Sequence, residues 1–371
     1  HQELFVEAHI ADLHFGVIDP QVQYSILNEQ FLNYIDGMNI LDIVSVNGDI
    51  FDHKFMANSD AVVYAIYFMN RLVDICRRKG TSLILISGTG SHDADQLKIF
   101  SPLMRDPTVD IRVIFNTQFI YVKGKKILCI PELYNKGEAY YNHFLMHSGQ
   151  YDACYMHGTY KGAIFGKDTA DLSSPREPVF DMNAFKFCKG PIISGHVHTP
   201  GCFDKHFYYC GSPYRWRFGE EEDKGFLILL HNIDSMQYYT HFEPITSFRY
   251  DTVNLDSMLS ADPHEVIEYI KHKKAEGIEN IRVQFTQNAE DKLAIIKAYF
   301  RNYPGVKIDA NFKNEAVVEE TTKLNDQYQQ YSFIFDKSAT PFEILAKYIN
   351  MQEGSTFITS DDLISIFEEE L

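Results

Sequence analysis

The chain has 371 residues, of which 45% are hydrophobic, so it holds enough apolar material for two to three domains with packed cores. Its formal net charge of −17 argues against a protein that coats nucleic acid nonspecifically, because such binding requires Lys and Arg to neutralise phosphates. No run of about 18 apolar residues occurs, which predicts no transmembrane helix and no membrane partner, and the N-terminus does not read as a signal peptide. Six scattered cysteines without a CxxC pair indicate a reduced, cytoplasmic protein.

The first 230 residues alternate strand-like and helix-like segments. Short apolar runs at 4–10, 41–47 and 82–88 are typical of strands, and apolar residues recur at helical spacing over 24–38 and 61–79. This alternation predicts an α/β fold with a layered core.

Five later apolar runs, with no long helix expected between them, predict a second and partly antiparallel sheet. They are KILCIPEL, YDACYMHG, GPIISGHVH, HFYYCGSP and GFLILLHN.

From about residue 245 the pattern changes to a small α+β unit. Asp262 is the expected N-cap of a helix with Pro263 at its first position, and a strand at 281–285, a helix at 289–303 and a strand at 306–312 follow. Beyond them, the sequence predicts a polar linker and then two amphipathic helices, the first opening on the capping-box pattern of Thr340 and Glu343.

His and Asp residues gather just past five of the apolar runs, where ligands bind in α/β sheets. They are Asp12 and His14, Asp49, His92 and Asp93, His157, and His196 and His198. A single Asp or His at a strand end is more often a turn or capping residue, and we read Asp52 and His53 that way. The order D-x-H, G-D-x-x-D, G-x-H-D, H-G and G-H-x-H is weak motif by motif and strong as a set.

The mixture of imidazole and carboxylate suits Mn, Fe or Zn rather than calcium. In D-L-H and H-V-H the two groups are two residues apart, so an extended segment would point both to one side. The candidate ligands are too many for one tetrahedral site and enough for two ions that share a bridging carboxylate, a pair that can activate water and clamp a phosphoryl group.

The stretches HIADLHFG, GDIFD, SGHVHTPG and YYCGSPYRWRFGE resemble the calcineurin-like metallophosphoesterases, and within them the SbcD-type double-strand-break-repair nucleases of bacteria and phages. The resemblance covers residues 4–230. It implies a four-layer α/β/β/α metallophosphoesterase sandwich, followed by a small α+β capping domain and C-terminal helices. The implied domains are a nuclease domain at 1–244, a capping and DNA-binding domain at 245–312, a linker at 313–335 and helices at 336–371 that dock an ATPase.

The resemblance also implies roles for single residues. Asp12, His14 and His198 would hold a first metal, Asp49 would bridge, His157 and His196 would hold a second, His92 would act as general acid or transition-state stabiliser, and Asp93 would orient the His92 imidazole. The family pattern G-N-H-D has an Asn that ligates the second metal, whereas this chain has Ser91. A hydroxyl is a shorter and poorer ligand, so we expect the second ion to bind more weakly.

The function implied is that of a two-metal DNA nuclease, a 3′–5′ exonuclease with endonuclease activity, using two divalent ions (Mn, with Mg as the alternative). Its partners would be DNA, a coiled-coil ATPase of the SbcC type and a second copy of the chain, in a bacterial cell or a phage-infected host. Candidate nucleic-acid contacts are Lys161, Lys205, Arg215 and Arg217. A candidate dimer contact is the helix face of Tyr64, Ile66, Tyr67 and Met69.

Four alternatives remain open from the residues. The cationic stretch around 205–217 could equally be an edge strand with a surface turn, and the helix face could equally be core. The chain could act chiefly as a DNA-binding regulatory subunit of the ATPase with weak nuclease activity, or as a phosphatase or phosphodiesterase of the same fold.

Overall fold

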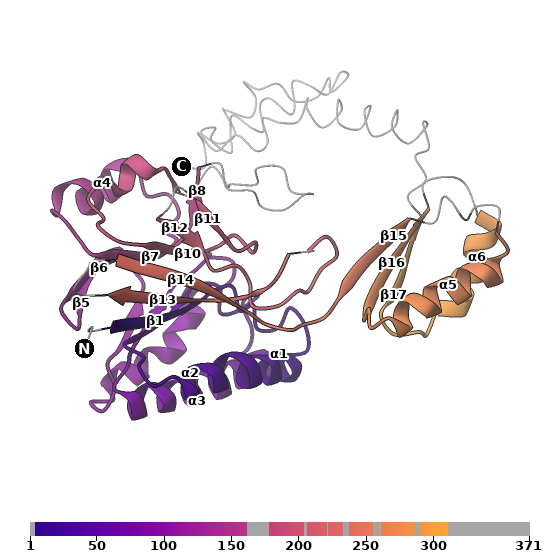
Figure 1. Cartoon of the computed structure of the whole chain (residues 1–371), viewed down its shortest axis with the longest axis horizontal. Coiled ribbons are helices and arrows are strands. Elements are labelled where there is room, and N and C mark those ends of the chain that lie inside the picture. The colour runs from indigo at the N-terminus through magenta and orange to yellow at the C-terminus, as the bar shows by residue number, and fades with distance from the viewer. Residues whose placement is uncertain are drawn as a thin grey trace, which may run out of the picture.

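The computed structural model describes residues 4–161, 178–203, 206–220, 222–232, 237–254, 258, 261–285 and 290–310. Over these residues the chain is an α/β protein, as the alternating sequence pattern predicted (Figure 1). The expected linker at 313–335, the expected helices at 336–371 and Lys205 lie outside the described residues. No helix among the described residues is long and apolar enough to cross a membrane.

The first sheet has the strand order β14-β13-β1-β2-β3-β4. Its strands are β1 (Leu4–Ile10), β2 (Ile43–Asn47), β3 (Ser82–Ile86), β4 (Ile111–Ile114), β13 (Gly225–Asn232) and β14 (Gln237–Pro244). The four N-terminal strands are parallel, which confirms the strands predicted there. The run GFLILLHN, expected in the second sheet, is instead β13, which pairs antiparallel with β1 of the first sheet.

Helices α1 (Pro20–Ile26) and α2 (Asn33–Gly37), joined by a π-helical segment (Leu27–Leu32), form the first crossover, and α3 (Asp60–Lys79) forms the second. Ser59 caps α3 by accepting a hydrogen bond from the Val62 amide, and Gly80 ends it at a φ of 65°. Of the face suggested as a dimer contact, Met69 is buried in the core, whereas Tyr67 is exposed.

The second sheet has the strand order β11-β12-β10-β7-β6-β5. Its strands are β5 (Gln118–Val122), β6 (Lys125–Ile130), β7 (Ala153–His157), β10 (Ile192–Gly195), β11 (Gly201–Phe203) and β12 (Phe207–Tyr209). Strands β6, β7, β10 and β12 are parallel and the two edge strands are antiparallel, so the expected mixed sheet is confirmed. The expectation that no long helix separates these strands was wrong, because α4 (Glu138–His147) connects β6 to β7.

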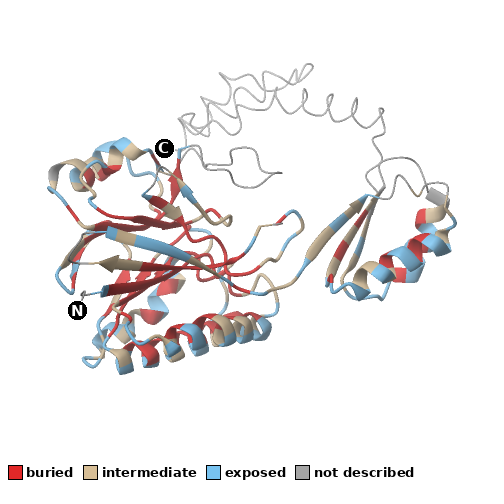
Figure 2. Cartoon of the chain, viewed as in Figure 1, coloured by how far each residue is buried: buried red, intermediate tan, exposed pale blue. Residues whose placement is uncertain are grey.

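The two sheets pack on each other through apolar side chains. Ile43, Ile84 and Ile86 of the first sheet share one buried cluster with Ile127 and Tyr155 of the second. Alternate residues of the same strands point the other way: Val44, Val46, Leu83 and Leu85 pack with α3, and Leu128, Ile130, Cys154 and Met156 pack with α4. Burial on both faces explains why these strands are continuous apolar runs, and Figure 2 shows them as mostly buried.

A third sheet, with all its strands parallel, follows β14 in the chain. It has the order β15-β16-β17, with β15 (Tyr250–Asn254), β16 (Asn280–Phe285), β17 (Val306–Ala310), and the helices α5 (Pro263–Ala275) and α6 (Glu290–Phe300). The predicted N-cap at Asp262 is present with a complete capping box, and the unit has its own apolar cluster. Two short strands, β8 (Thr159–Tyr160) and β9 (Val179–Phe180), pair separately.

Candidate metal centre

The polar strand ends of both sheets converge. Four groups of side chains each place one ligand atom per residue within 4.8 Å of the others: Asp12, His14 and His198; His14, Asp49 and His92; Asp12, Asp49 and His157; and Glu132, His157 and His196. Because the groups share Asp12, His14, Asp49 and His157, they form one continuous cluster. The structure therefore brings together the six His and Asp residues expected as ligands, along with His92. Ser91, by contrast, is exposed on its turn.

The backbone at this cluster is in an unusual conformation. Asp12, His14, Asp49 and His196 have φ values of 53°, 44°, 53° and 94°, in the left-handed region that non-glycine residues rarely adopt. Such conformations cost free energy and persist where the surrounding structure enforces them, commonly at functional sites. Four of the six non-glycine residues with positive φ in the described chain belong to this cluster.

Glycines let the strand ends approach closely. A Cβ on Gly88 would lie 2.2 Å from the Asp49 Oδ1 atom and 2.3 Å from the Asp49 backbone nitrogen. A Cβ on Gly195 would lie 2.2 Å from the Asn47 carbonyl oxygen. The glycine-rich turn after β3 is thus required for contact with the loop that carries Asp49.

Asp93 holds this loop in place. Its carboxylate accepts hydrogen bonds from the backbone amides of Gly88 and Asp49, both at 2.9 Å, and of Ile50 and Phe51, at 2.8 and 3.1 Å. Burial raises the pKa of Asp93 to about 6. The expectation that Asp93 orients the His92 ring does not hold, because both carboxylate oxygens are taken by backbone donors.

His92 is oriented by a different group. Its Nδ1 atom hydrogen-bonds the carbonyl oxygen of Asp52, and its ring lies 4.7 Å from the ring of His14. The neutral tautomer with a proton on Nδ1 fits this contact, and it leaves Nε2 for chemistry. Asp52, read from the sequence as a capping residue, also places its carboxylate 3.4 Å from Nδ1 of His14.

Several buried polar atoms of the cluster have no hydrogen-bond partner among the described residues: both ring nitrogens of His14, Nδ1 of His198 and Oε1 of Glu132. The ring of Trp216 lies 5.0 Å from that of His14 and 4.8 Å from that of His198, so it walls one side. Buried polar atoms normally have partners, so this group of unsatisfied atoms has the free capacity that a bound metal ion would need.

Electrostatics couple the buried groups. Burial alone would raise the pKa of Asp49, but His157 and His14 lower it well below its usual range. Burial raises the pKa of Asp12, and the neighbouring Asp49 charge adds to that rise. Burial lowers the pKa of His198 far below its usual value, with help from His14 and Arg217, which keeps the ring neutral and able to bind a metal.

Sequence reasoning missed Glu132 and Thr89. Glu132 follows β6 and has a fully buried side chain, with Oε2 3.1 Å from Nδ1 of His196 and 3.6 Å from Nε2 of His157. The Thr89 hydroxyl lies 3.2 Å from Asp49 Oδ2 and 3.1 Å from Glu132 Oε2. The signal was present, because Glu132 lies just past the apolar part of the run KILCIPEL, as the other candidate ligands lie just past theirs, but it is neither His nor Asp.

The residues expected to contact nucleic acid differ from one another. The Arg215 guanidinium donates two hydrogen bonds to the Glu222 carbonyl oxygen, at 2.7 and 3.1 Å, so it stabilises the local loop. Arg217 has a side chain 49% exposed and is close enough to His198 to lower its pKa. Lys161 is exposed just beyond β8.

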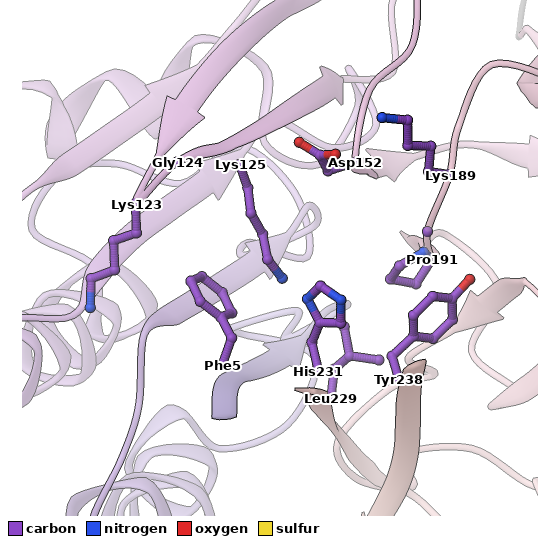
Figure 3. A pocket seen from close by; sticks show the side chains of 11 residues that line it. Phe5, Lys123, Gly124, Lys125, Asp152, Lys189, Pro191, Leu229, His231 and Tyr238 are labelled. Carbon is purple, nitrogen blue, oxygen red and sulfur yellow. The ribbon is translucent and has the colours of Figure 1, made fainter. Parts of the chain in front are cut away.

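A cavity of about 250 Å³ opens at the other end of the strands (Figure 3). Its lining includes Phe5, Lys125, Pro191, His231 and Tyr238, which begin parallel strands or belong to the β13–β14 hairpin. It is therefore separate from the metal-ligand cluster at the carboxyl ends.

No family model matches the chain, and no curated protein matches it either. One solved structure of a protein not named in its description aligns with 66% of this chain and 100% of its own, at 11% identity and a TM-score of 0.37. A protein of unknown function from Aquifex aeolicus aligns with 49% of this chain and 94% of its own, at 15% identity and a TM-score of 0.23. Similarities this weak carry no argument about fold or function.

Proposed function

We propose that the chain is a two-metal phosphodiesterase, a DNA nuclease of the SbcD type, built on the four-layer α/β/β/α sandwich of the metallophosphoesterases. One observation carries the proposal: His and carboxylate groups from six strand ends meet in a buried cluster. Within it, both ring nitrogens of His14, Nδ1 of His198 and Oε1 of Glu132 have no hydrogen-bond partner among the described residues. Structural polar clusters are normally satisfied internally, whereas metal sites are satisfied by the ion.

The donor set fits two divalent ions. Asp12, His14 and His198 form one group around unpartnered nitrogens, His157 and His196 form the other, and Asp49 touches both groups. Mixed nitrogen and oxygen donors favour Mn²⁺ over Ca²⁺, with Mg²⁺ as the weaker alternative. Two such ions would supply an activated water and neutralise the charge on a phosphodiester.

The protein's own residues would position the Asp49 carboxylate, donate a proton and contact the substrate. Asp93 and Gly88 hold the Asp49 loop against the β3 turn, so the central carboxylate cannot swing away. The Asp52 carbonyl oxygen accepts a hydrogen bond from Nδ1 of His92, so that in the doubly protonated ring the Nε2–H group would donate its proton to the leaving oxygen. Trp216 lies beside His198 and would offer a stacking surface to a nucleic-acid strand, and the half-exposed Arg217 follows it in the chain and would add a cation.

The nuclease would act with partners. The resemblance favours a coiled-coil ATPase docked on the C-terminal helices and a second copy of the chain, in the cytoplasm of a bacterium or phage-infected host. Deleting 336–371 is expected to abolish ATPase binding and to leave metal-dependent cleavage intact, which a pull-down and a nuclease assay would measure on the same sample.

The first experiment incubates the purified chain with end-labelled double-stranded DNA and Mn²⁺, beside a His92→Ala variant. We expect Mn²⁺-dependent release of nucleotides that is lost in the variant, because His92 is the proton carrier. Hydrolysis of nitrophenyl phosphate without cleavage of DNA would replace the nuclease by a phosphatase. DNA binding with no hydrolysis of either substrate would favour the regulatory-subunit role.

A further inference from the structure

Three neighbouring parallel strands of the second sheet end at one point. Strand β6 pairs with β7 through Ile130 and Met156, and β7 pairs with β10 through His157 and Gly195. The residues that follow these pairs are therefore side by side, and Glu132 reaches the same place as His157 and His196.

The Glu132 carboxylate occupies the centre of this group. Oε2 lies 3.1 Å from His196 Nδ1, 3.6 Å from His157 Nε2 and 3.1 Å from the Thr89 hydroxyl. Oε1 has no hydrogen-bond partner among the described residues, although the side chain is completely buried. A buried carboxylate oxygen without a donor is costly unless a cation meets it.

We propose that Glu132 is a direct ligand of the second metal ion and replaces the amide that Ser91 cannot supply. Ser91 is exposed on its turn, whereas Glu132 already faces both histidines of that site. The second ion then has two carboxylates, Asp49 and Glu132, where the family pattern provides one carboxylate and one neutral amide. The inference rests on the proposed two-metal function, and it predicts the opposite of the weak second site expected from Ser91.

The added charge has a consequence for the metal. An anionic oxygen attracts a divalent ion more strongly than a hydroxyl or an amide does, since ligand charge is a main determinant of affinity for hard ions. The second ion is thus retained at low metal concentration, and restoring Asn at position 91 adds little.

The test counts Mn²⁺ ions by equilibrium dialysis with metal analysis and measures the Mn²⁺-induced rise in Tm. The variants are Glu132→Gln, which keeps the shape, and Glu132→Ala. Glu7→Gln is the matched control, because Glu7 is an equally buried carboxylate away from the cluster. Circular dichroism of each metal-free variant checks that it is folded.

We expect two ions in the full chain and in Glu7→Gln, one in Glu132→Ala, and an affinity for the second ion at least about 10-fold lower in Glu132→Gln. Ser91→Asn should leave both affinities within about twofold. Two ions bound with unchanged affinity in Glu132→Gln and Glu132→Ala would overturn the role of Glu132 and leave the two-metal function standing. No Mn²⁺ bound to the full chain would instead overturn the two-metal function itself.

Discussion

Two buried polar groups on the same strands differ in how their atoms are satisfied: the cluster at the carboxyl ends and the network around Glu7. At the carboxyl ends, ring nitrogens of His14 and His198 and one oxygen of Glu132 have no hydrogen-bond partner in the described part of the chain. Toward the amino ends, Glu7 is equally buried, but Tyr155 donates to one of its oxygens at 2.6 Å and Lys125 to the other at 2.7 Å.

Both carboxylate oxygens of Glu7 have hydrogen-bond partners, and the neighbouring His9 ring is also fully hydrogen-bonded. His9 contacts Glu7 at 3.1 Å through one ring nitrogen and the Ser45 hydroxyl at 2.6 Å through the other, and Lys125 also lies over the Phe5 ring. A satisfied buried network stabilises and specifies the packing of two sheets. The comparison teaches that burial and charge do not separate the two clusters, whereas unsatisfied hydrogen-bonding atoms and left-handed backbone occur at the carboxyl-end cluster.

The largest expected effect on activity comes from removing the carboxylate of Asp49, which lies in the centre of the cluster at the carboxyl ends of the strands. Asp49→Asn should reduce Mn²⁺-dependent hydrolysis by at least about 1,000-fold, because losing a bound ion forfeits several kcal/mol of charge stabilisation. Steady-state kinetics with labelled DNA measure it, and Asp74→Asn, on the surface of α3, is the control. An active Asp49→Asn enzyme would mean that the cluster is not the reaction centre.

A methyl group added at Gly88 should reduce activity only by displacing the Asp49 loop, because it removes no polar group of the cluster. Gly88→Ala forces apart the β3 turn and the Asp49 loop, and a misplacement of about 1 Å can reduce catalysis about 100-fold. Gly137→Ala is the matched control, since nothing lies within 4 Å of its Cβ position. Comparing kcat for the two variants checks the prediction, and equal activity would show that the strand ends can separate without loss.

A substitution in the network around Glu7 should lower the stability of the fold and leave the catalytic activity unchanged. Glu7→Gln removes the charge that Lys125 and His9 require, and it should lower the free energy of unfolding by about 2 kcal/mol while leaving kcat unchanged. Urea unfolding at neutral pH measures the loss. A change in kcat with no change in stability would contradict the division between the two ends.

The same variant predicts a pH dependence. Burial alone would raise the pKa of Glu7, but His9 and Lys125 lower it from 4.5 to about 2. A lowered carboxyl pKa stabilises the folded state above the ordinary pKa, and the contribution is lost as the pH falls from 4.5 toward 2. The stability difference between the full chain and Glu7→Gln should therefore shrink over that interval, and a constant difference would argue against an ionised Glu7.

The smallest expected effect lies at the exposed rim of the carboxyl end. Arg217→Ala should weaken DNA binding by less than about 1 kcal/mol, since a half-exposed cation is screened by solvent and already lies 3.5 Å from Glu220. The salt dependence of binding should fall by roughly one counterion. Arg78→Ala, paired with Asp36 away from the cluster, is the control, and equal effects of the two changes would remove Arg217 from the DNA path.

The sequence determined most strands, the helix at 61–79 and every residue of the cluster except Glu132. These were predictable because they are local: apolar runs buried on both faces, helical spacing and a cap at Asp262 are written in adjacent residues. The His and Asp residues at the strand ends could be grouped because parallel strands bring their carboxyl ends to one edge.

Tertiary structure decided the rest. Which sheet receives β13 depends on partners far along the chain, so GFLILLHN alone could not reveal that it pairs with β1. Asp93 binds the Asp49 loop instead of His92, and Glu132 reaches the cluster, because two loops and two sheets meet there. Spacing gives the edge on which a side chain lies, but only packing in three dimensions determines which atoms are satisfied and which are left for a ligand.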